Sequence, residues 1–289
     1  MDSILRRYCK KHNFVLRKGE NISILLTLAL NWVLHLKLQL YKWLHGIHRP
    51  IVHYYAVCWN EERMLPFVFD YYSKFVDKFI MYDNGSTDKS IEIINAQKNT
   101  NYVHFETDGF DDTVHAEIKN NCWKQSRGKA DFVIVCDIDE FVYHPQIELF
   151  LDKLKKERIS LPSPHGYSMY SETFPVLGQG ITEQIRTGVA DEGYSKCLLF
   201  DPNLIYEVNY DPGAHICHPL GIVNRNEDYK VLHYKNLDID AVLCRTRINA
   251  ARLSPANKEL NLGFGYLYPE ERIRKEFEEG LKNSQDVVS

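Results

Sequence analysis

The sequence lacks the features that define several common classes of protein. Its seven cysteines are scattered and form no Cys-x-x-Cys pair, so a zinc site built on cysteines is not expected. No period of about 20–50 residues recurs, which excludes a solenoid. With 44% hydrophobic and 26% charged residues, the 289-residue chain is neither disordered nor a multi-span membrane protein. Several cysteines lie in apolar runs, and we interpret them as reduced and mostly buried, which favours a reducing compartment.

Basic residues are outnumbered by acidic residues outside the first 50 residues. Residues 1–50 carry nine Lys and Arg against two Asp and Glu, a net charge of +7. The remaining residues carry 26 basic and 37 acidic side chains, a net charge of −11. Because duplex binding depends on a basic face, no nucleic-acid partner is expected for this acidic body. Its carboxylates suit divalent cations better.

The N-terminal segment contains a stretch without charged residues: residues 21–36 carry no formal charge if His35 is neutral. These 16 residues are short of the ~20 that span a bilayer. Polar residues recur every fourth position, at Ser23, Thr27, Asn31, His35 and Gln39, and would form one narrow stripe on a helix whose flanks are basic. The pattern predicts a helix that lies on a membrane surface, so that residues 1–50 are the membrane contact.

Two other interpretations of this segment stay open. The helix can pack on the protein's own body or on a partner, or it can be a single-pass signal anchor. No small-x-small site follows the apolar run, so a cleaved signal peptide is not expected. The first interpretation places the protein in the cytoplasm, peripheral to the inner face of a membrane. A potential N-glycosylation sequence at residues 84–86, inside the expected ligand site, agrees with a cytoplasmic location.

Strand and helix patterns alternate along the first part of the body. The expected strands cover residues 51–58, 75–82, 102–106 and 131–136, and the expected helices cover 61–74, 87–97, 114–126 and 147–157. This alternation predicts an α/β fold with a mostly parallel, Rossmann-like central sheet and helices on both faces. After about residue 158 the pattern becomes mixed α+β, with further helices expected at 238–252 and 269–281. We therefore divide the chain into residues 1–50, 51–160 and 161–289.

Acidic residues follow every one of the four expected strands. They fall at residues 60–62 (NEE), 83–88 (DNGSTD), 107–108 (TD) and 137–140 (DIDE). In an open parallel sheet, ligands bind outside the carboxyl ends of the strands. Carboxylates crowded at one edge repel one another unless a positive charge lies between them, and a divalent metal would provide that charge. Mg²⁺ or Mn²⁺ with oxygen ligands, bridging the phosphates of a substrate, is the expected cofactor.

Asp137 and Asp139 are the central candidates in this set. In an extended segment, residues two apart face the same side, so both carboxylates would enter one cleft while Ile138 faces the sheet. The plainer alternative is a solvated acidic turn. Asp83 ends another apolar strand and is expected to face the same cleft, although residues 83–88 also have the composition of an Asx-Gly turn before a helix.

Three motifs together resemble those of family 2-like glycosyltransferases with the A-type fold. They are residues 58–62 (CWNEE), 82–88 (YDNGSTD) and 135–141 (VCDIDEF). The closest similarity is to a bacterial branch of surface-polysaccharide enzymes with an Asp-Ile-Asp-Glu-Phe signature. Residues 232–235 (LHYK) are similar to the downstream His-Tyr element of that branch. The resemblance covers roughly residues 51–280.

The resemblance implies an activity and a set of site residues. A sugar would pass from a nucleotide-diphosphate donor to a hydroxyl of a glycan or lipid-linked acceptor, with inversion, in surface-polysaccharide synthesis. Residues 51–160 would bind the nucleotide sugar and residues 161–289 would form the acceptor side. The implied donor-binding residues are Asn60, Glu61, Asp83, Asp137, Lys196 and His215, and the implied ligands of Mn²⁺ or Mg²⁺ are Asp137, Asp139 and His233.

The general base of an inverting reaction has no clean counterpart in the sequence. Asp191 and Glu192 are the preferred candidates because Gly188 and Gly193 make their segment loop-like, and residues 227–228 (ED) are the alternative. Either pair can equally belong to a solvated loop. Arg245, Arg247 and Arg252 are interpreted as a solvent-facing side of a helix, and contact of one of them with a phosphate is the alternative.

Two other functions compete with a glycosyltransferase. A sugar nucleotidyltransferase needs a Gly-rich loop with Lys or Arg after its first strand, and residues 60–63 (NEER) contain no glycine. A non-catalytic nucleotide-sugar-binding scaffold has no need of the crowded acidic edge.

Overall fold

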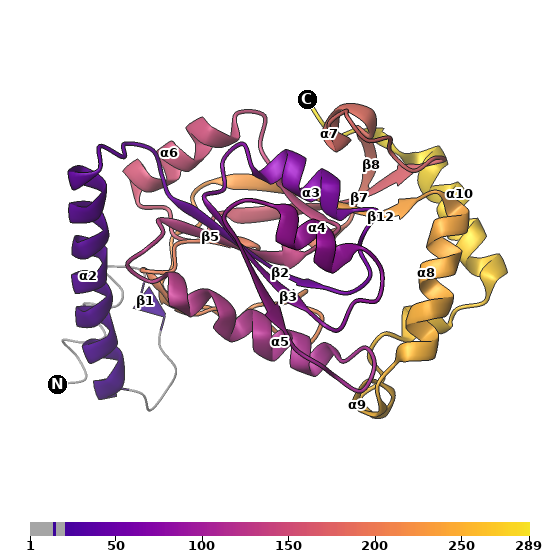
Figure 1. The fold of residues 1–289 in the computed structure, drawn as a ribbon, viewed down its shortest axis with the longest axis horizontal. Helices are drawn as coiled ribbons and strands as arrows, with labels where there is room; N and C mark the ends of the chain where they lie inside the picture. Colours follow the sequence, from indigo (N-terminus) through magenta and orange to yellow (C-terminus); the bar gives the residue numbers. More distant parts are fainter. Residues whose placement is uncertain (1–13, 16–20) are drawn as a thin grey trace.

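The computed structural model describes residues 14–15 and 21–289 (Figure 1). Its central sheet has five strands in the order β4-β3-β2-β5-β9. The strands are β2 (Val52–Cys58), β3 (Lys78–Asp83), β4 (Thr100–His104), β5 (Phe132–Asp137) and β9 (Leu199–Phe200). The first four are mutually parallel and β9 runs antiparallel to β5. The predicted mostly parallel sheet is therefore confirmed.

Helices cover both faces of this sheet, as the alternation predicts. They are α3 (Leu65–Tyr72), α4 (Ser90–Ala96), α5 (Asp112–Asn121), the 3₁₀ helix η1 (Cys122–Ser126) and α6 (Ile147–Glu157). Successive residues of β2 face opposite sides: Tyr54 lies in the core cluster that contains α3 and α6, whereas Tyr55 lies in the cluster that contains Trp123 of η1. Burial of both faces explains why the strands are continuous apolar runs.

A second sheet of five strands carries the mixed half of the chain, in the order β13-β8-β7-β12-β6. Its strands are β6 (Glu140–Tyr143), β7 (Ser163–Ser171), β8 (Thr187–Ala190), β12 (Asp228–Leu237) and β13 (Gln285–Asp286). Strand β6 begins three residues after β5 ends and pairs antiparallel with β12, with His233 opposite Glu140. This pairing brings the His-Tyr element beside the Asp-Ile-Asp-Glu segment, about 95 residues away in sequence.

Helices α8 (Ile239–Arg252) and α10 (Glu270–Asn283) lie at the end of the molecule opposite α2 (Asn21–Leu44) (Figure 1). Three short helices, α7 (Ile181–Gln184), η2 (Glu192–Tyr194) and α9 (Pro255–Glu259), interrupt the loops, and η3 (Phe264–Leu267) precedes α10. A small sheet joins β1 (Phe14–Val15), β11 (Leu220–Ile222) and β10 (Ile205–Glu207). The six cysteines of the described residues are unpaired, and four of them are buried; Cys9 lies outside the described residues.

Helix α2 packs on the body, as one of the three interpretations expects. Leu38 is buried with Ile51 and Ala130, at the starts of β2 and β5. Lys42 places its Nζ 2.5 Å from the Oδ2 of Asp131 and donates to the carbonyl of Arg49 at 2.6 Å. Of the helices in the described part of the chain, none combines the length and the hydropathy required to cross a bilayer.

Burial of His53 in β2 makes stability depend on pH. Desolvation lowers the pKa of His53 from 6.5 to about 4, so the folded protein holds fewer protons there than the unfolded chain between these values. The contribution of His53 to the free energy of unfolding is therefore fully present above pH 6.5. It decreases by about 3 kcal/mol as the pH drops to about 4. We expect His53→Asn, which can keep a hydrogen bond to Ser126, to flatten the decline in melting temperature between pH 7 and pH 4. The same change at exposed His48 is the control, and equal slopes for all three proteins would contradict the assignment.

Candidate active site

A cavity of about 430 Å³ opens at the carboxyl ends of β2 and β5, and α8 forms one of its walls. It has this position because a parallel sheet leaves a crevice where its strands end and its loops begin. Asp137 is the last residue of β5 and Asp139 lies in the turn into β6, and both line the cavity. Ile138 between them is only 2% exposed and belongs to the core. The spacing of two residues therefore directs the two carboxylates to one cavity, as the sequence predicts.

Side-chain cations neutralise both carboxylates in this structure. Lys119 of α5 lies 2.6 Å from Oδ1 of Asp137, and Lys196 lies 3.6 Å from its Oδ2. Burial alone would raise the pKa of Asp137, but these two lysines outweigh it and lower the value to about 2. The positive charge that the crowded acids require therefore comes, here, from the chain itself.

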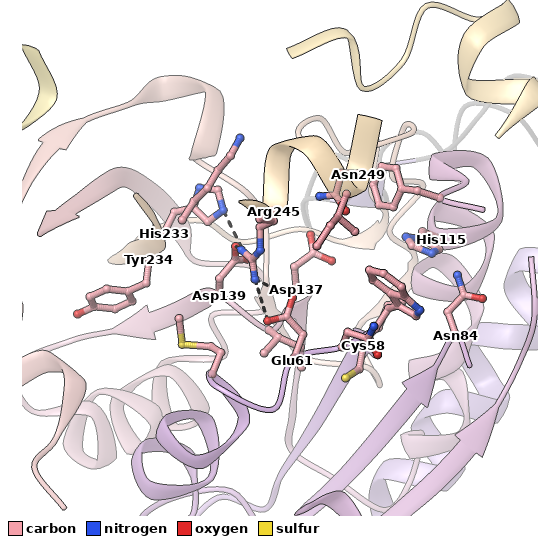
Figure 2. Close-up of a pocket in the computed structure, with 18 of the residues that line it drawn as sticks. Cys58, Glu61, Asn84, His115, Asp137, Asp139, His233, Tyr234, Arg245 and Asn249 are labelled. Atoms are coloured by element: carbon pink, nitrogen blue, oxygen red, sulfur yellow. Dashed lines mark hydrogen bonds and ion pairs between the residues drawn. The ribbon is translucent and has the colours of Figure 1, made fainter. Parts of the chain in front are cut away.

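Asp139 lies between an arginine and a histidine (Figure 2). Nη1 of Arg245 is 2.8 Å from its Oδ2, and Nε2 of His233 is 3.5 Å from its Oδ1. Burial opposes ionisation of Asp139, but His233 and Arg245 hold its pKa well below the usual range. Asp139 is thus an anion with a guanidinium and an imidazole beside it.

Arg245 is the main residue of the site that sequence reasoning missed. Its Nη2 donates to both carboxylate oxygens of Glu61 at 2.8 Å, so one guanidinium joins the loop after β2 to the turn after β5 (Figure 2). Burial raises the pKa of Glu61 to about 7, although Arg245 favours its charged form. The prediction of a solvent-facing arginine is wrong for Arg245, because α8 turns this side toward the cavity.

The spacing of residues along α8 is consistent with one side of the helix facing a cavity. Residues Ala241, Arg245, Ile248, Asn249 and Arg252 of α8 line the cavity at helical intervals of three and four. Arg252 stacks its guanidinium over Trp59, 3.2 Å from the ring centroid. Two arginines seven residues apart on one helical face fit an anion-binding wall as well as a solvated one, and only the tertiary structure distinguishes them.

Four of the predicted donor-binding residues line the cavity besides Asp137: Asn60, Glu61, Lys196 and His215. Asn60 has φ of +51°, which asparagine tolerates, and its Oδ1 accepts hydrogen bonds from the backbone of residues 87 and 88. Lys196 is 3% exposed and lies 2.5 Å from Oε1 of Glu140. His215 contacts the carbonyl of Gly193 through Nδ1 at 2.6 Å.

Asp83 does not face the cavity, contrary to the sequence expectation. It is fully buried, and its carboxylate accepts hydrogen bonds from the backbone and the hydroxyl of Ser86. The turn composition of residues 83–88, which the sequence offered as a second interpretation, accounts for this arrangement. Asn84 lines the cavity in its place.

Asp191 and Glu192 are likewise outside the cavity wall. Asp191 caps η2, accepting from the backbone of Gly193 at 3.0 Å and from the hydroxyl of Ser168 at 2.9 Å, and Glu192 is exposed. Tyr194, at the end of the same turn, does line the cavity. The alternative Glu227 pairs with Lys153 at 2.6 Å, away from the site. Asp191 and Glu227 thus have structural partners that explain their positions without a catalytic role.

Asp137, Asp139 and His233 fit a divalent ion by the chemistry of their donor atoms. Carboxylate oxygens are the ligands that Mg²⁺ and Mn²⁺ prefer. Nε2 of His233 stands beyond good hydrogen-bonding distance of Asp139, and its buried Nδ1 has no partner among the described residues. Within residues 14–15 and 21–289, however, no three such side chains already converge as a metal centre. Arg245 donates to Oδ2 of Asp139, so it occupies an oxygen that would otherwise be free to bind an ion.

No family model matches the chain, and no curated protein sequence matches it. Solved structures are similar to parts of it. For S. aureus TarS 1–349, the identity is 13% and the TM-score is 0.35, over 78% of this chain and 70% of that one. For glucosyl-3-phosphoglycerate synthase from Mycobacterium tuberculosis with Mg²⁺ and uridine diphosphate, the identity is 16% and the TM-score is 0.38, over 77% of this chain and 81% of that one. For 4-diphosphocytidyl-2C-methyl-D-erythritol synthase from Anaerococcus prevotii, the identity is 15% and the TM-score is 0.29, over 53% of this chain and 70% of that one. Similarity this weak assigns neither family nor activity.

Proposed function

We propose that this protein is a glycosyltransferase that moves a sugar from a nucleoside-diphosphate donor to a hydroxyl group of an acceptor. The observation that carries the proposal is the placement of Asp137 and Asp139 in one cavity at the carboxyl end of a parallel sheet, with two buried lysines and a partly buried arginine beside them. A cavity that combines anions and cations in this way suits a ligand with a phosphate group and sugar hydroxyls. The resemblance of the three sequence motifs to family 2-like glycosyltransferases supports the same reaction.

The cations of the cavity have a direct task in this reaction. When the sugar leaves, negative charge grows on the nucleoside diphosphate, and fixed positive groups stabilise that charge without reorganisation. Lys119 and Lys196 are buried, 5% and 3% exposed, so they are held in place and weakly screened by water. Trp59, held by Arg252, offers an aromatic face within the same cavity.

A divalent ion, Mn²⁺ or Mg²⁺, belongs to this proposal, with Asp137, Asp139 and His233 as the residues that would hold it. When bound, such an ion supplies further positive charge toward the diphosphate. The chain's own part is to present the two carboxylates and the imidazole on adjoining strands, and to release Asp139 from Arg245.

Removing the guanidinium should strengthen metal binding if Arg245 competes for Asp139. We expect Arg245→Gln to bind Mn²⁺ at least tenfold more tightly than the wild type in the absence of donor, because a positive charge beside the ligand is lost. Calorimetric titration of Mn²⁺ alone measures this. Arg247→Gln, at an exposed arginine of the same helix, is the matched control. Weaker Mn²⁺ binding by Arg245→Gln would show that Arg245 supports the metal site instead of competing with it.

The acceptor is proposed to be a glycan or a lipid-linked glycan of a surface polysaccharide, on the strength of the sequence resemblance. The activity itself is tested by the release of nucleoside diphosphate from a panel of nucleotide sugars, with Mn²⁺, Mg²⁺ or EDTA. Release from one donor that EDTA abolishes is the expected result. Release of pyrophosphate from a nucleoside triphosphate and a sugar phosphate would indicate a nucleotidyltransferase. Donor binding without turnover, with every acceptor class supplied, would indicate a binding scaffold.

A further inference from the structure

The outward face of α2 is apolar over its described side chains. Large hydrophobic residues recur along this face at helical intervals, and each is at least 46% exposed. They include Leu30, Trp32, Val33, Leu36, Leu40 and Trp43. Lys37 is the one formally charged residue among the exposed positions of α2 from 29 to 44. Such a patch is uncommon on a monomeric protein and marks an interaction surface.

The orientation of α2 is the reverse of that of an ordinary surface helix. An amphipathic helix turns its apolar stripe to the core and its polar stripe to water. In α2 the polar stripe faces the body: Asn31 and Lys42 are each 3% exposed. Lys42 reaches Asp131, and Lys155 lies 3.0 Å from the other oxygen of that carboxylate. Because these buried partners fix the rotation of the helix, its apolar face is directed away from the protein.

We propose that this face of α2 docks on an anionic lipid surface. Charge in the sequence favours lipid as the occupant, because the segment that contains α2, residues 1–50, carries a net charge of +7 whereas the rest of the chain carries −11. Exposed aromatic residues agree: Trp32 is 64%, Tyr41 48% and Trp43 77% exposed, and tryptophan and tyrosine favour the membrane–water interface. A second copy, packed symmetrically through α2, would instead bring two segments of +7 together.

The docking face and the candidate active site lie at opposite ends of the same strands. Helix α2 packs where β2 and β5 begin, through Ile51 and Asp131, and the cavity lies where β2 and β5 end. Strand β2 has seven residues, so about 20 Å of sheet separates them. A protein docked through α2 would therefore hold its cavity at the end of the sheet farther from the lipid surface. Lipid binding and donor binding should respond to different substitutions.

Vesicle co-sedimentation of the full chain tests the proposal. The probes are vesicles of equal parts phosphatidylglycerol and phosphatidylcholine, and vesicles of phosphatidylcholine alone. We expect the wild type to bind the anionic vesicles, less so at high salt, and the double variant Leu36→Gln/Leu40→Gln to bind at least tenfold more weakly. Val176→Gln/Leu177→Gln, which changes two apolar residues of a loop that are at least as exposed, is the matched control and should bind as the wild type does.

Two results would overturn the proposal. One is wild-type protein that stays in the supernatant with both kinds of vesicle. The other is equal binding by the wild type and the α2 variant. If light scattering then finds a dimer that the α2 variant dissociates, the face belongs to a second copy. Donor binding, measured on the same proteins, reports on the proposed function separately.

Discussion

Asp139→Asn is expected to lower kcat/KM for nucleoside-diphosphate release about 10³-fold, equivalent to about 4 kcal/mol of transition-state stabilisation. The substitution keeps the shape of the side chain and removes its charge. Asp139 is 9% exposed and faces His233 and Arg245, so its charge holds both groups at the cavity. Loss of that charge frees Arg245 and weakens any site for a divalent ion.

The control for this prediction is Asp108→Asn, which removes one carboxylate from an exposed position near the same edge of the sheet. We expect it to leave turnover within about twofold of the wild type, because the charge of an exposed group is screened by water. Melting curves of both variants separate a catalytic effect from unfolding. Wild-type turnover by folded Asp139→Asn would remove this residue from the proposed mechanism.

Lys196→Met should lower the free energy of unfolding by about 3–5 kcal/mol, because it leaves a buried carboxylate without its cation. Lys196 and Glu140 are 4% and 1% exposed at their side chains and stand 2.5 Å apart. Glu140 also accepts a hydrogen bond from the backbone of Asp137 at 2.9 Å, so a loss of order there reaches the candidate site. Denaturant unfolding with a fluorescence readout measures the change.

The double variant Lys196→Met/Glu140→Gln distinguishes a lost ion pair from a lost contact. We expect it to be more stable than Lys196→Met alone, because the buried negative charge is removed together with its partner. Stability equal to or below that of the single variant would show that Lys196 acts through packing or through Asp137, 3.6 Å away.

Local patterns sufficed to predict the part of the fold that surrounds the site. The apolar run of residues 131–136 corresponds to β5. Because residues two apart in an extended segment face the same side, Asp137 and Asp139 lie in one cavity. Both predictions depend only on the period of a strand and on the burial of a parallel sheet. No local pattern predicts the pairing of β12 with β6, which brings His233 to Asp139; the motif resemblance indicated only that His233 belongs to the site.

The residues that sequence reasoning misplaced depend on tertiary contacts. Arg245 lies on a helix whose pattern fits solvent as well as a cavity, and only the packing of α8 over Asp139 decides between them. Asp83 has the same sequence context whether it faces a ligand or closes a turn, and Ser86 completes the turn. The polar stripe of α2 could be predicted from the sequence. Whether it faces the body or solvent could not, because it depends on the contact of Lys42 with Asp131, 89 residues away.

The central claim, that the cavity binds a nucleoside diphosphate, is tested most directly by calorimetric titration. Uridine, guanosine, cytidine and adenosine diphosphates would each be titrated into the wild type and Asp139→Asn with Mn²⁺ present. The proposed function predicts that at least one of them binds the wild type, and that Asp139→Asn binds it at least tenfold more weakly. Failure of all four to bind the wild type, or equal binding by the variant, would contradict the assignment of the site.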